Sequence, residues 1–577
     1  MRHRWPEDTR FTRVVLEVED NICAVCGAAL HICDHRRHRI FTLQGPVEVV
    51  CKLAHCSDRH CAAHAKTRSP YAETILTQPW WLIGWDVFCW MGHRRFARHW
   101  SVPQIRSELA DTYQIPLSAD AVEDALRRYQ TMLAARQQAP QVVAAAYQNV
   151  EALVLSIDGL QPEKGHETLY VVRELNAKRI WFAEALLSSS ADEVRRLLIQ
   201  AQAWATQLGL PVHLWLSDKQ DAFVTGIAAE FPGVPHRYCV NHFLRDLAKP
   251  MLDADSHAKV KMRSKVRGLR AIEREVLQLR RPIATAAPAV APAATTPTGE
   301  SPAVVPAATT PVSHVPANQV TKDIPAAPAP PADASEVVLA YCSAVRGILN
   351  DDQGGPLQPP GLRMAEALGD VRASLQRNLD ANRGGRAHTQ LQRLAACIDR
   401  GVAEVQAEHM VVRQHVQEIQ RVAATLTSAN GVAAVRQTQF TRLQEEFAGL
   451  DTPFYQHVAG VMAGFAAGLF VGGETLPCLQ DNLDLERWFR KPKGHERRIH
   501  GHRHAGVRIV QEGPTLLLVL DAHMTHPEPF TAHDLEPYQD ASAPPCQVEA
   551  MQRRKIMRKA RSKKNDSSCS QHWKAGT

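Results

Sequence analysis

The sequence lacks the long apolar runs that mark membrane-spanning and secreted proteins. Its most apolar stretch, QPWWLIGWDVFCWMGH, is shorter than the roughly 20 residues that cross a bilayer, and it contains Asp86. The first ten residues, MRHRWPEDTR, are charged and do not include the apolar core of a signal peptide. A glycine-rich Walker loop is also missing, so no pattern predicts ATP binding. We therefore expect a soluble cytoplasmic protein without a membrane partner.

The chain has little excess charge, and its cysteines do not suggest a disulfide framework. A net charge of +7 over 577 residues is a modest excess, so its placement matters more than its size. In an intracellular chain of this length the 13 cysteines are not expected to form a disulfide framework, and those that cluster favour metal binding. A chain this long exceeds one hydrophobic core, which predicts several domains.

Composition changes along the chain. Residues 20–70 are rich in cysteine and histidine, and residues 282–335 consist mainly of alanine, proline, threonine and valine. The second segment cannot build a packed core and is expected to be a disordered linker. From 336 to about 449, apolar residues recur at spacings of three and four, which predicts helices.

Strand and helix patterns alternate between residues 151 and 247. Ser190 followed by Glu193 predicts a capped amphipathic helix that Gly209 closes, and a second, short helix precedes the last strand. A ribonuclease H-like domain has the same element order: three strands, a helix, a strand, a helix and a strand. The predicted strands cover 152–159, 168–175, 179–186, 212–216 and about 236–240.

Two of these strands end on an aspartate. Asp158 ends the first strand and Asp218 ends the fourth, and in a ribonuclease H-like sheet these strands are neighbours. A pair of carboxylates there is an oxygen-rich site suited to Mg²⁺ or Mn²⁺, the ions that serve phosphodiester chemistry. The alternative is that each aspartate merely caps its strand.

A third acid is expected in the stretch NLDLERWFRKPKGHERRIHGHRH. Glu486 shares a helical face with Asn482 and Arg490, and three other acids compete with it: Asp481, Asp484 and Glu496. The surrounding basic residues either pair with these acids or hold a phosphate backbone. The candidates for DNA contact here are Arg490, Lys491, Lys493, Arg497 and Arg498.

Together with the string Cys239-Val240-Asn241-His242, these acids give the chain a resemblance to a known family. It resembles the DDE transposases of bacterial insertion sequences, in the broad group that includes Mutator-like elements and carries a C-x-x-H signature after the second acid. The resemblance implies that Asp158, Asp218 and Glu486 are the catalytic, magnesium-binding acids. It also implies that Cys239 and His242 support the active site, whether by packing, by contact with DNA or as half of a zinc site.

The resemblance completes the expected architecture. It is an α/β protein whose ribonuclease H-like core is interrupted by an all-helical insertion and preceded by a zinc ribbon and a helix-turn-helix. The Ala/Pro-rich linker departs from the family pattern. The expected segments are a zinc ribbon (1–75), a helical DNA-binding domain (76–148), the first part of the core (149–247), the insertion (248–474), the second part of the core (475–530) and a disordered basic tail (531–577).

The ribbon prediction starts from a Cys-x₂-Cys knuckle followed by Gly27, a hairpin pattern and a second cysteine group. Cys51, Cys33, His31, His55 or His60 could replace a member, and unliganded buried cysteines are the alternative to zinc. The expected zinc ligands are Cys23, Cys26, Cys56 and Cys61.

A helix-turn-helix is expected between 101 and 133. The pattern predicts a helix over 102–113, a break at 115–117 and a second helix capped by Ser118, with Arg127 and Arg128 on its exposed end for DNA contact. Any two-helix hairpin gives a similar pattern. The basic run RRKIMRKARSKK near the carboxyl end is expected either to solubilise the chain or to contact DNA.

These features predict a transposase of the bacterial, nucleoid-associated cytoplasm. It would bind the terminal repeats of its element as a homo-oligomer on double-stranded DNA. It would then cut the ends with water and join the freed 3′-hydroxyl groups to target DNA, using Mg²⁺ or Mn²⁺ for chemistry and Zn²⁺ for structure. The alternatives are a non-catalytic DNA-binding regulator derived from a transposase, and a nuclease that only hydrolyses.

Overall fold

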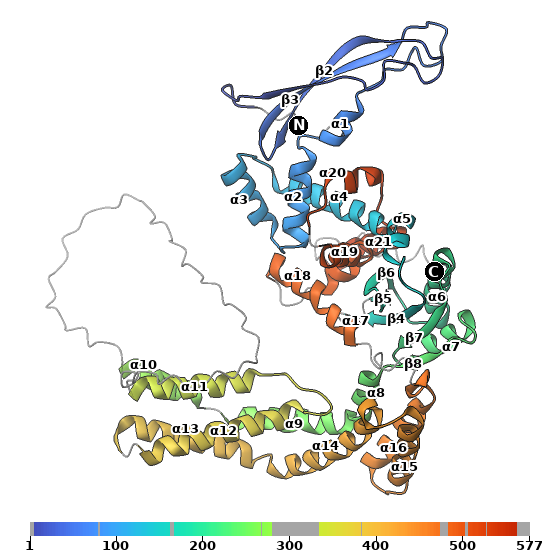
Figure 1. Ribbon diagram of the computed structural model, residues 1–577. Helices are drawn as coiled ribbons and strands as arrows, with labels where there is room; N and C mark the ends of the chain where they lie inside the picture. The colour runs from blue at the N-terminus through green and yellow to red at the C-terminus, as the bar shows by residue number, and fades with distance from the viewer. Residues whose placement is uncertain are drawn as a thin grey trace, which may run out of the picture. The chain divides into compact units, whose positions relative to one another are not determined.

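A computed structural model describes most of the chain as two compact units. The sheet unit comprises Met1–Asp246 and Ala424–Thr577, and the helical unit comprises Leu247–Ala423 (Figure 1). No helix in the described part is long and apolar enough to cross a membrane. Residues 282–333 of the predicted linker and 562–577 of the predicted tail lie outside the described residues. Those described are 5–78, 81–161, 167–266, 268–279, 334–381, 384–473, 483–501, 506–526 and 528–561.

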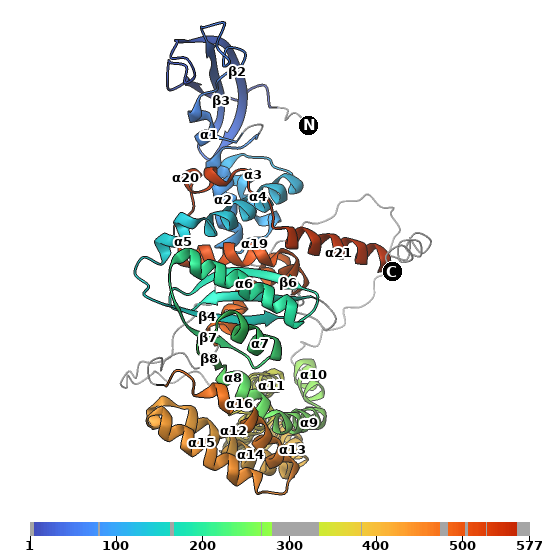
Figure 2. The ribbon, with the colours of Figure 1, turned by 90° about the vertical axis from the view of Figure 1, so that its right-hand side faces the viewer.

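The amino-terminal region of the sheet unit is a three-stranded sheet. Its strands are β1 (Thr12–Leu16), β2 (Leu30–Thr42) and β3 (Gly45–Cys56), in the order β1-β3-β2. The predicted hairpin is present and longer than expected, because β2 and β3 stay paired from Thr42 and Gly45 out to Leu30 and Cys56. Helix α1 (Tyr71–Leu76) lies beside β3 (Figure 2).

Four helices follow: α2 (Trp85–Phe96), α3 (Val102–Tyr113), α4 (Ala119–Gln137) and α5 (Pro140–Ala146). Both helices predicted between 101 and 133 are present. Ser101 caps α3 in a capping box with Gln104, Gln114 ends it in a left-handed conformation (φ 57°), and Ser118 caps α4. Helix α4 packs against α2 and α3, so these helices share one core.

A five-stranded mixed sheet forms the centre of the sheet unit. Its strands lie in the order β6-β5-β4-β7-β8, so the first and fourth predicted strands are parallel neighbours. Ser190 and Gly209 bound α6 as predicted. The elements are β4 (Leu153–Leu160), β5 (Thr168–Glu174), β6 (Arg179–Leu186), α6 (Ala191–Leu208), β7 (Val212–Ser217), α7 (Asp221–Glu230) and β8 (His236–Tyr238).

Helices cover both faces of this sheet. Leu155 and Phe182 pack with Leu197 of α6 and Phe223 of α7 on one face. On the other face, β5 and β6 pack against α19 (Gly506–Thr525), which also contacts α4 (Figure 1). Two short helices precede α19: α17 (Leu483–Trp488) and α18 (Arg490–His500).

The helical unit is shorter than the insertion predicted at 248–474. Helices α15 (Ala433–Ala448) and α16 (Pro453–Leu469) belong to the sheet unit, where Phe465 stacks edge-on against Tyr238 at 5.9 Å. Helix α8 (Val240–Leu247) also lies almost wholly in the sheet unit. The helical unit is built from α9 (Lys249–Lys265), α10 (Leu269–Leu279), α11 (Ala334–Asn350), α12 (Pro360–Ala381), α13 (Gly385–Ala403) and most of α14 (Gln406–Leu426).

The prediction of a disordered tail from 531 is wrong for the part that the structure describes. Helices α20 (Ala532–Leu535) and α21 (Pro545–Arg561) occupy it, with a 3₁₀ turn at Glu536–Tyr538. The buried Arg554 of α21 pairs with the buried Glu167 at 3.4 Å, and Arg553 lies 3.8 Å from the same carboxylate. Two of the basic residues expected to be free therefore attach α21 to the sheet unit.

Candidate functional site

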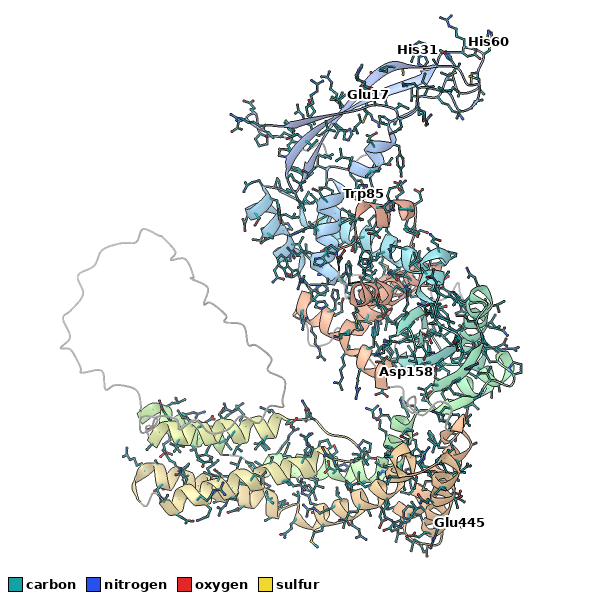
Figure 3. The ribbon with its side chains drawn as sticks, viewed as in Figure 1. Glu17, His31, His60, Trp85, Asp158 and Glu445 are labelled. Atoms are coloured by element: carbon teal, nitrogen blue, oxygen red, sulfur yellow. The ribbon has the colours of Figure 1, made fainter. Side chains whose placement is uncertain are left out.

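The central strands bring two aspartates to the same edge of the sheet. Ser156 of β4 pairs with Leu216 of β7, and each aspartate lies two residues farther along its strand direction. Asp158 is drawn at this end of the sheet in Figure 3. The parallel pairing therefore brings Asp158 and Asp218 to the same end of neighbouring strands. Asp218 directly follows β7, whereas Asp158 does not end its strand as predicted, because β4 continues to Leu160 and Asp158 still pairs with Val171 of β5.

Asp158 is a buried carboxylate, only 7% exposed. Burial, and to a smaller extent the negative charges of Asp218 and Glu486, raise its pKa to about 7. The backbone N–H of Gly159 donates to Oδ1 at 2.7 Å and opposes the rise. The pKa of Asp158 thus reflects the charges of both other acids, which lie within electrostatic reach of its carboxylate.

Asp218 has an unsatisfied oxygen. Its Oδ1 is buried and accepts no hydrogen bond within the described part of the chain. Burial raises the pKa of Asp218, while positive charge on His242 and the backbone N–H of Gln220 lower it. A buried carboxylate oxygen without a donor is costly unless a cation binds it.

Glu486 lies on α17, which packs beside β4, and its charge acts on Asp158. Leu485 and Trp488 are buried and fix the helix, leaving Glu486 half-buried. Asn241 Nδ2 donates to both oxygens of Glu486, each at 2.9 Å. His242 Nδ1 lies 3.7 Å from Glu486 Oε1. We refer to Asp158, Asp218 and Glu486 as the acid site.

The competing acids are placed differently. Asp484 is half-exposed and pairs with Arg173 at 3.2 Å. Glu496 is buried on α18 and lines a cavity of about 370 Å³ together with Arg95 and Arg508. Asp481 lies outside the described residues. Of the described candidates, only Glu486 contributes to the electrostatics of Asp158.

The acid site fits a hard divalent cation by its donor chemistry. It offers carboxylate oxygens alone, which Mg²⁺ and Mn²⁺ prefer. The unsatisfied Asp218 Oδ1 and the raised pKa of Asp158 both show negative charge without sufficient compensation. Among the described residues, however, Asp158, Asp218 and Glu486 do not form a group whose ligand atoms all lie within 4.8 Å of one another, so a shared ion would require their side chains to move.

The C-x-x-H residues lie against this site. Cys239 is fully buried at the start of α8, and its backbone N–H donates to Ser217 O at 2.8 Å, which places it next to Asp218. His242 Nδ1 has no hydrogen-bond partner among the described residues. One potential ligand atom from each of Cys239, His242 and Glu486 lies within 4.8 Å of the others.

The second candidate site is a group of four cysteines at one end of the amino-terminal sheet. Their ligand atoms all lie within 4.8 Å of one another, and a tetrahedral ZnS₄ site separates sulfurs by about 3.8 Å. Gly27 makes the tight turn in a left-handed conformation, with φ 74°. The cysteine cluster could hold a metal ion and is compatible with Zn²⁺. Its measured pairs are Cys23 with Cys61 at 3.8 Å and Cys26 with Cys56 at 3.4 Å.

The pKa values of the cluster reflect close thiols. Backbone N–H groups of Val25 and Cys26 lower the pKa of Cys23 to about 7. Burial and the neighbouring sulfurs raise the pKa of Cys56 to about 12. Cys23 is thus prepared to ionise, whereas Cys56 needs a nearby cation to ionise.

The alternative zinc ligands lie outside this cluster. Cys33 is exposed on β2, and Cys51 is buried near His38 and Glu73. His31 and His60 are exposed near the same end of the sheet (Figure 3). His55 stacks edge-on with His64 at 5.1 Å.

The basic residues predicted for DNA contact fall into two groups. Arg127 and Arg128 lie in the middle of α4 rather than at its end, because the helix continues to Gln137. Arg127 is exposed and pairs with Asp124 at 2.8 Å. On α18, four residues are exposed and form no ion pair with a carboxylate in the described regions: Arg490, Lys491, Arg497 and Arg498.

Lys493 of α18 is half-buried, and its charge interacts with that of Asp158. Burial and Arg497 lower its pKa, while the charge of Asp158 opposes that change. Lys493 therefore lies near both the acid site and the exposed cations of α18.

Two residues of the site escaped the sequence-based prediction. Asn241 holds Glu486, and Arg245, one turn farther along α8, lowers the pKa of Asp158. Their spacing of four along a helix that begins at the C-x-x-H string was the available signal. No protein-family model matches the sequence, and no curated protein matches it either.

Proposed function

We propose that this protein is a DDE-type DNA transposase. It binds the terminal repeats of its element, cleaves DNA strands and transfers the freed ends to target DNA. The observation that carries the proposal is the acid site: two aspartates at the same end of adjacent parallel strands, with a glutamate supplied by a helix 268 residues after the second (486 − 218).

The sheet supports the ribonuclease H-like part of the proposal. Its order β6-β5-β4-β7-β8 puts the first strand at the centre, flanked by the second and fourth, as that fold requires. The helical unit lies between Asp218 and Glu486 in the sequence, where the family resemblance expects an insertion. Both features agree with the resemblance without identifying the reaction.

In the proposed reaction, the chain's own residues position DNA and hold charge. Mg²⁺ bound by Asp158, Asp218 and Glu486 would polarise the phosphodiester and activate the attacking oxygen. Asn241 restrains the Glu486 carboxylate through two 2.9 Å hydrogen bonds. Lys493 is placed to contact the phosphate that approaches Asp158.

DNA binding is proposed for three surfaces. The exposed, unpaired cations of α18 would neutralise backbone phosphates beside the acid site. Helices α3 and α4 would form the helix-turn-helix, with Arg127 and Arg128 near the duplex. The amino-terminal sheet would act as a zinc ribbon that holds the transposon end, with Zn²⁺ in the cysteine cluster.

The test is cleavage and strand transfer on DNA that carries the element's own ends, first with Mg²⁺ and then with Mn²⁺. Asp218→Ala and Glu486→Gln should keep end binding and lose at least about 100-fold in cleavage rate, because each removes a ligand charge at the reacting phosphate. Glu496→Gln is the matched control and should retain cleavage, since Glu496 lines a different cavity.

Each outcome decides between the candidates. An active Glu486→Gln variant would move the third acid elsewhere. Wild-type protein that binds the ends and never cuts with either metal would favour the non-catalytic regulator. Cleavage without joining would favour a hydrolytic nuclease.

A further inference from the structure

We infer that Cys239, His242 and Glu486 form a zinc site that shares Glu486 with the acid site. This C-x-x-H site would take a borderline-soft transition metal, Zn²⁺ above all, rather than Mg²⁺. The existence of the site does not depend on the proposed function. Only the inhibition described below rests on it.

The geometry is close to that of a bound zinc. His242 Nδ1 and Glu486 Oε1 are 3.7 Å apart, and two such ligands on one tetrahedral zinc are separated by about 3.4 Å. The Cys239 ligand atom lies within 4.8 Å of both. Side-chain adjustments of a few tenths of an ångström up to about 1 Å would bring all three onto one ion.

The ligand atoms are also available in chemical terms. His242 Nδ1 is buried and makes no hydrogen bond within the described residues, so zinc binding breaks none at this atom. Asn241 donates to both oxygens of Glu486 and would remain as a supporting donor while Oε1 turns to the metal. Cys239 would bind as the thiolate and release its proton to solvent.

Thiolate and imidazole ligands discriminate between metals. Mg²⁺ prefers six oxygen ligands and binds sulfur poorly, whereas Zn²⁺ accepts one sulfur, one nitrogen and one oxygen and leaves a fourth position open. Asp158 and Asp218 offer oxygen alone, while Cys239 and His242 add the softer donors. Glu486 can serve as the third ligand either to the two aspartates or to Cys239 and His242.

This sharing predicts competition. Zinc held by Cys239 and His242 would bind Glu486 Oε1 and withdraw it from the acid site. Zn²⁺ should therefore inhibit magnesium-dependent cleavage. Loss of the Cys239 ligand should raise the inhibitory zinc concentration by at least about tenfold. Even substitution of a residue that only hydrogen-bonds to a metal ligand typically lowers metal affinity by that factor.

The primary test is a metal count on the full-length protein. The protein is saturated with Zn²⁺, freed of loosely bound metal by gel filtration and analysed by atomic emission. Wild type should carry one zinc more per chain than Cys239→Ser and His242→Gln. Cys342→Ser is the matched control, because Cys342 is equally buried but lies in the helical unit away from any metal cluster, and it should keep the wild-type count.

Substitution with Co²⁺ gives a second readout. Thiolate-to-cobalt absorbance should fall by the share of one sulfur in five in Cys239→Ser, because the cysteine cluster contributes four. In His242→Gln, the absorbance should keep its full sulfur contribution, but the ligand-field bands of the bound cobalt should change. Circular dichroism verifies that each variant is folded, and His242→Gln, at a partly exposed position, covers the case in which Cys239→Ser does not fold.

The results separate this inference from the proposed function. Equal zinc counts in wild type, Cys239→Ser and His242→Gln would overturn the site. A difference of one zinc in a protein that never cleaves DNA would support the site and refute the transposase. A difference of one zinc with zinc-sensitive cleavage would support both.

Discussion

Replacing Glu496 by glutamine should stabilise the sheet unit above pH 7. Glu496 lies on α18 and is only 1% exposed, and its Oε2 accepts no hydrogen bond within the described residues. His500 Nε2 lies 3.7 Å and Arg508 Nε lies 3.9 Å from Oε2, too far for hydrogen bonds, and of the two only Arg508 carries a permanent positive charge. The carboxylate is therefore buried without full compensation, which destabilises the folded state whenever it is charged.

The magnitude follows from the pKa. Burial raises the pKa of Glu496 from 4.5 to about 7, although Arg508 and Arg95 oppose the rise. Because one pKa unit corresponds to about 1.4 kcal/mol, this rise corresponds to about 3 kcal/mol at pH 8. Below pH 4.5 Glu496 is protonated in both the folded and the unfolded chain, so it has no effect on stability. Between pH 4.5 and about 7 the unfolded chain releases this proton more readily, so the folded state loses stability as the pH rises. Glutamine removes this loss, and we expect a gain of about 2 kcal/mol at pH 8 after relaxation of the neighbouring side chains.

Hydrogen exchange of peptides from α18, corrected for intrinsic rates, measures the local opening free energy at pH 8 and at pH 4.5. Glu512→Gln is the matched control. Glu512 is partly exposed and pairs with Arg508 at 2.9 Å, so its replacement should cost no more than about 1 kcal/mol. A gain from Glu496→Gln that is the same at both pH values, or a loss at pH 8, would refute the reasoning.

Two further perturbations test other parts of the structure. Removal of metal with a strong chelator should expose the cysteine cluster, so a thiol reagent should then detect four additional fast-reacting cysteines. The exposed Cys33 is the control and should react equally before and after chelation. Unchanged reactivity of the four cysteines would argue against a metal in the cluster. Asp255→Ala should lower the stability of the helical unit by about 3 kcal/mol, because buried Asp255 accepts the N–H groups of Gly361 at 2.6 Å and Leu362 at 2.8 Å at the start of α12. Hydrogen exchange of α12 measures this loss, and the exposed Asp253→Ala should change it by less than about 0.5 kcal/mol.

Local sequence signals predicted the secondary structure around the acid site well. Apolar runs gave the five strands, and serine caps gave the starts of α4 and α6. These signals are readable because they depend on neighbouring residues: a strand alternates or stays apolar, and a cap side chain bonds a backbone N–H three residues later. The adjacency of β4 and β7 followed from the element order alone.

Features that depend on distant residues were missed. Pairing of Arg554 with Glu167, 387 residues away, turns part of the expected loose tail into a packed helix. The assignment of α16 to the sheet unit depends on the close fit of Gly468 against Tyr238. The two acids Glu486 and Glu496 both follow helical patterns among basic residues, and only the tertiary packing shows which of them lies near Asp158.

The position of α19 has a consequence for synthesis on the ribosome. The five strands are complete at residue 238, but the helix that covers the outer face of β5 and β6 ends at residue 525, or 287 residues later (525 − 238). At about 5 to 20 residues per second, that face waits roughly 14 to 57 seconds for its partner. The nascent chain therefore presents apolar sheet surface to chaperones for about half of its translation. Glu486 also emerges late, so an incomplete chain cannot assemble the acid site.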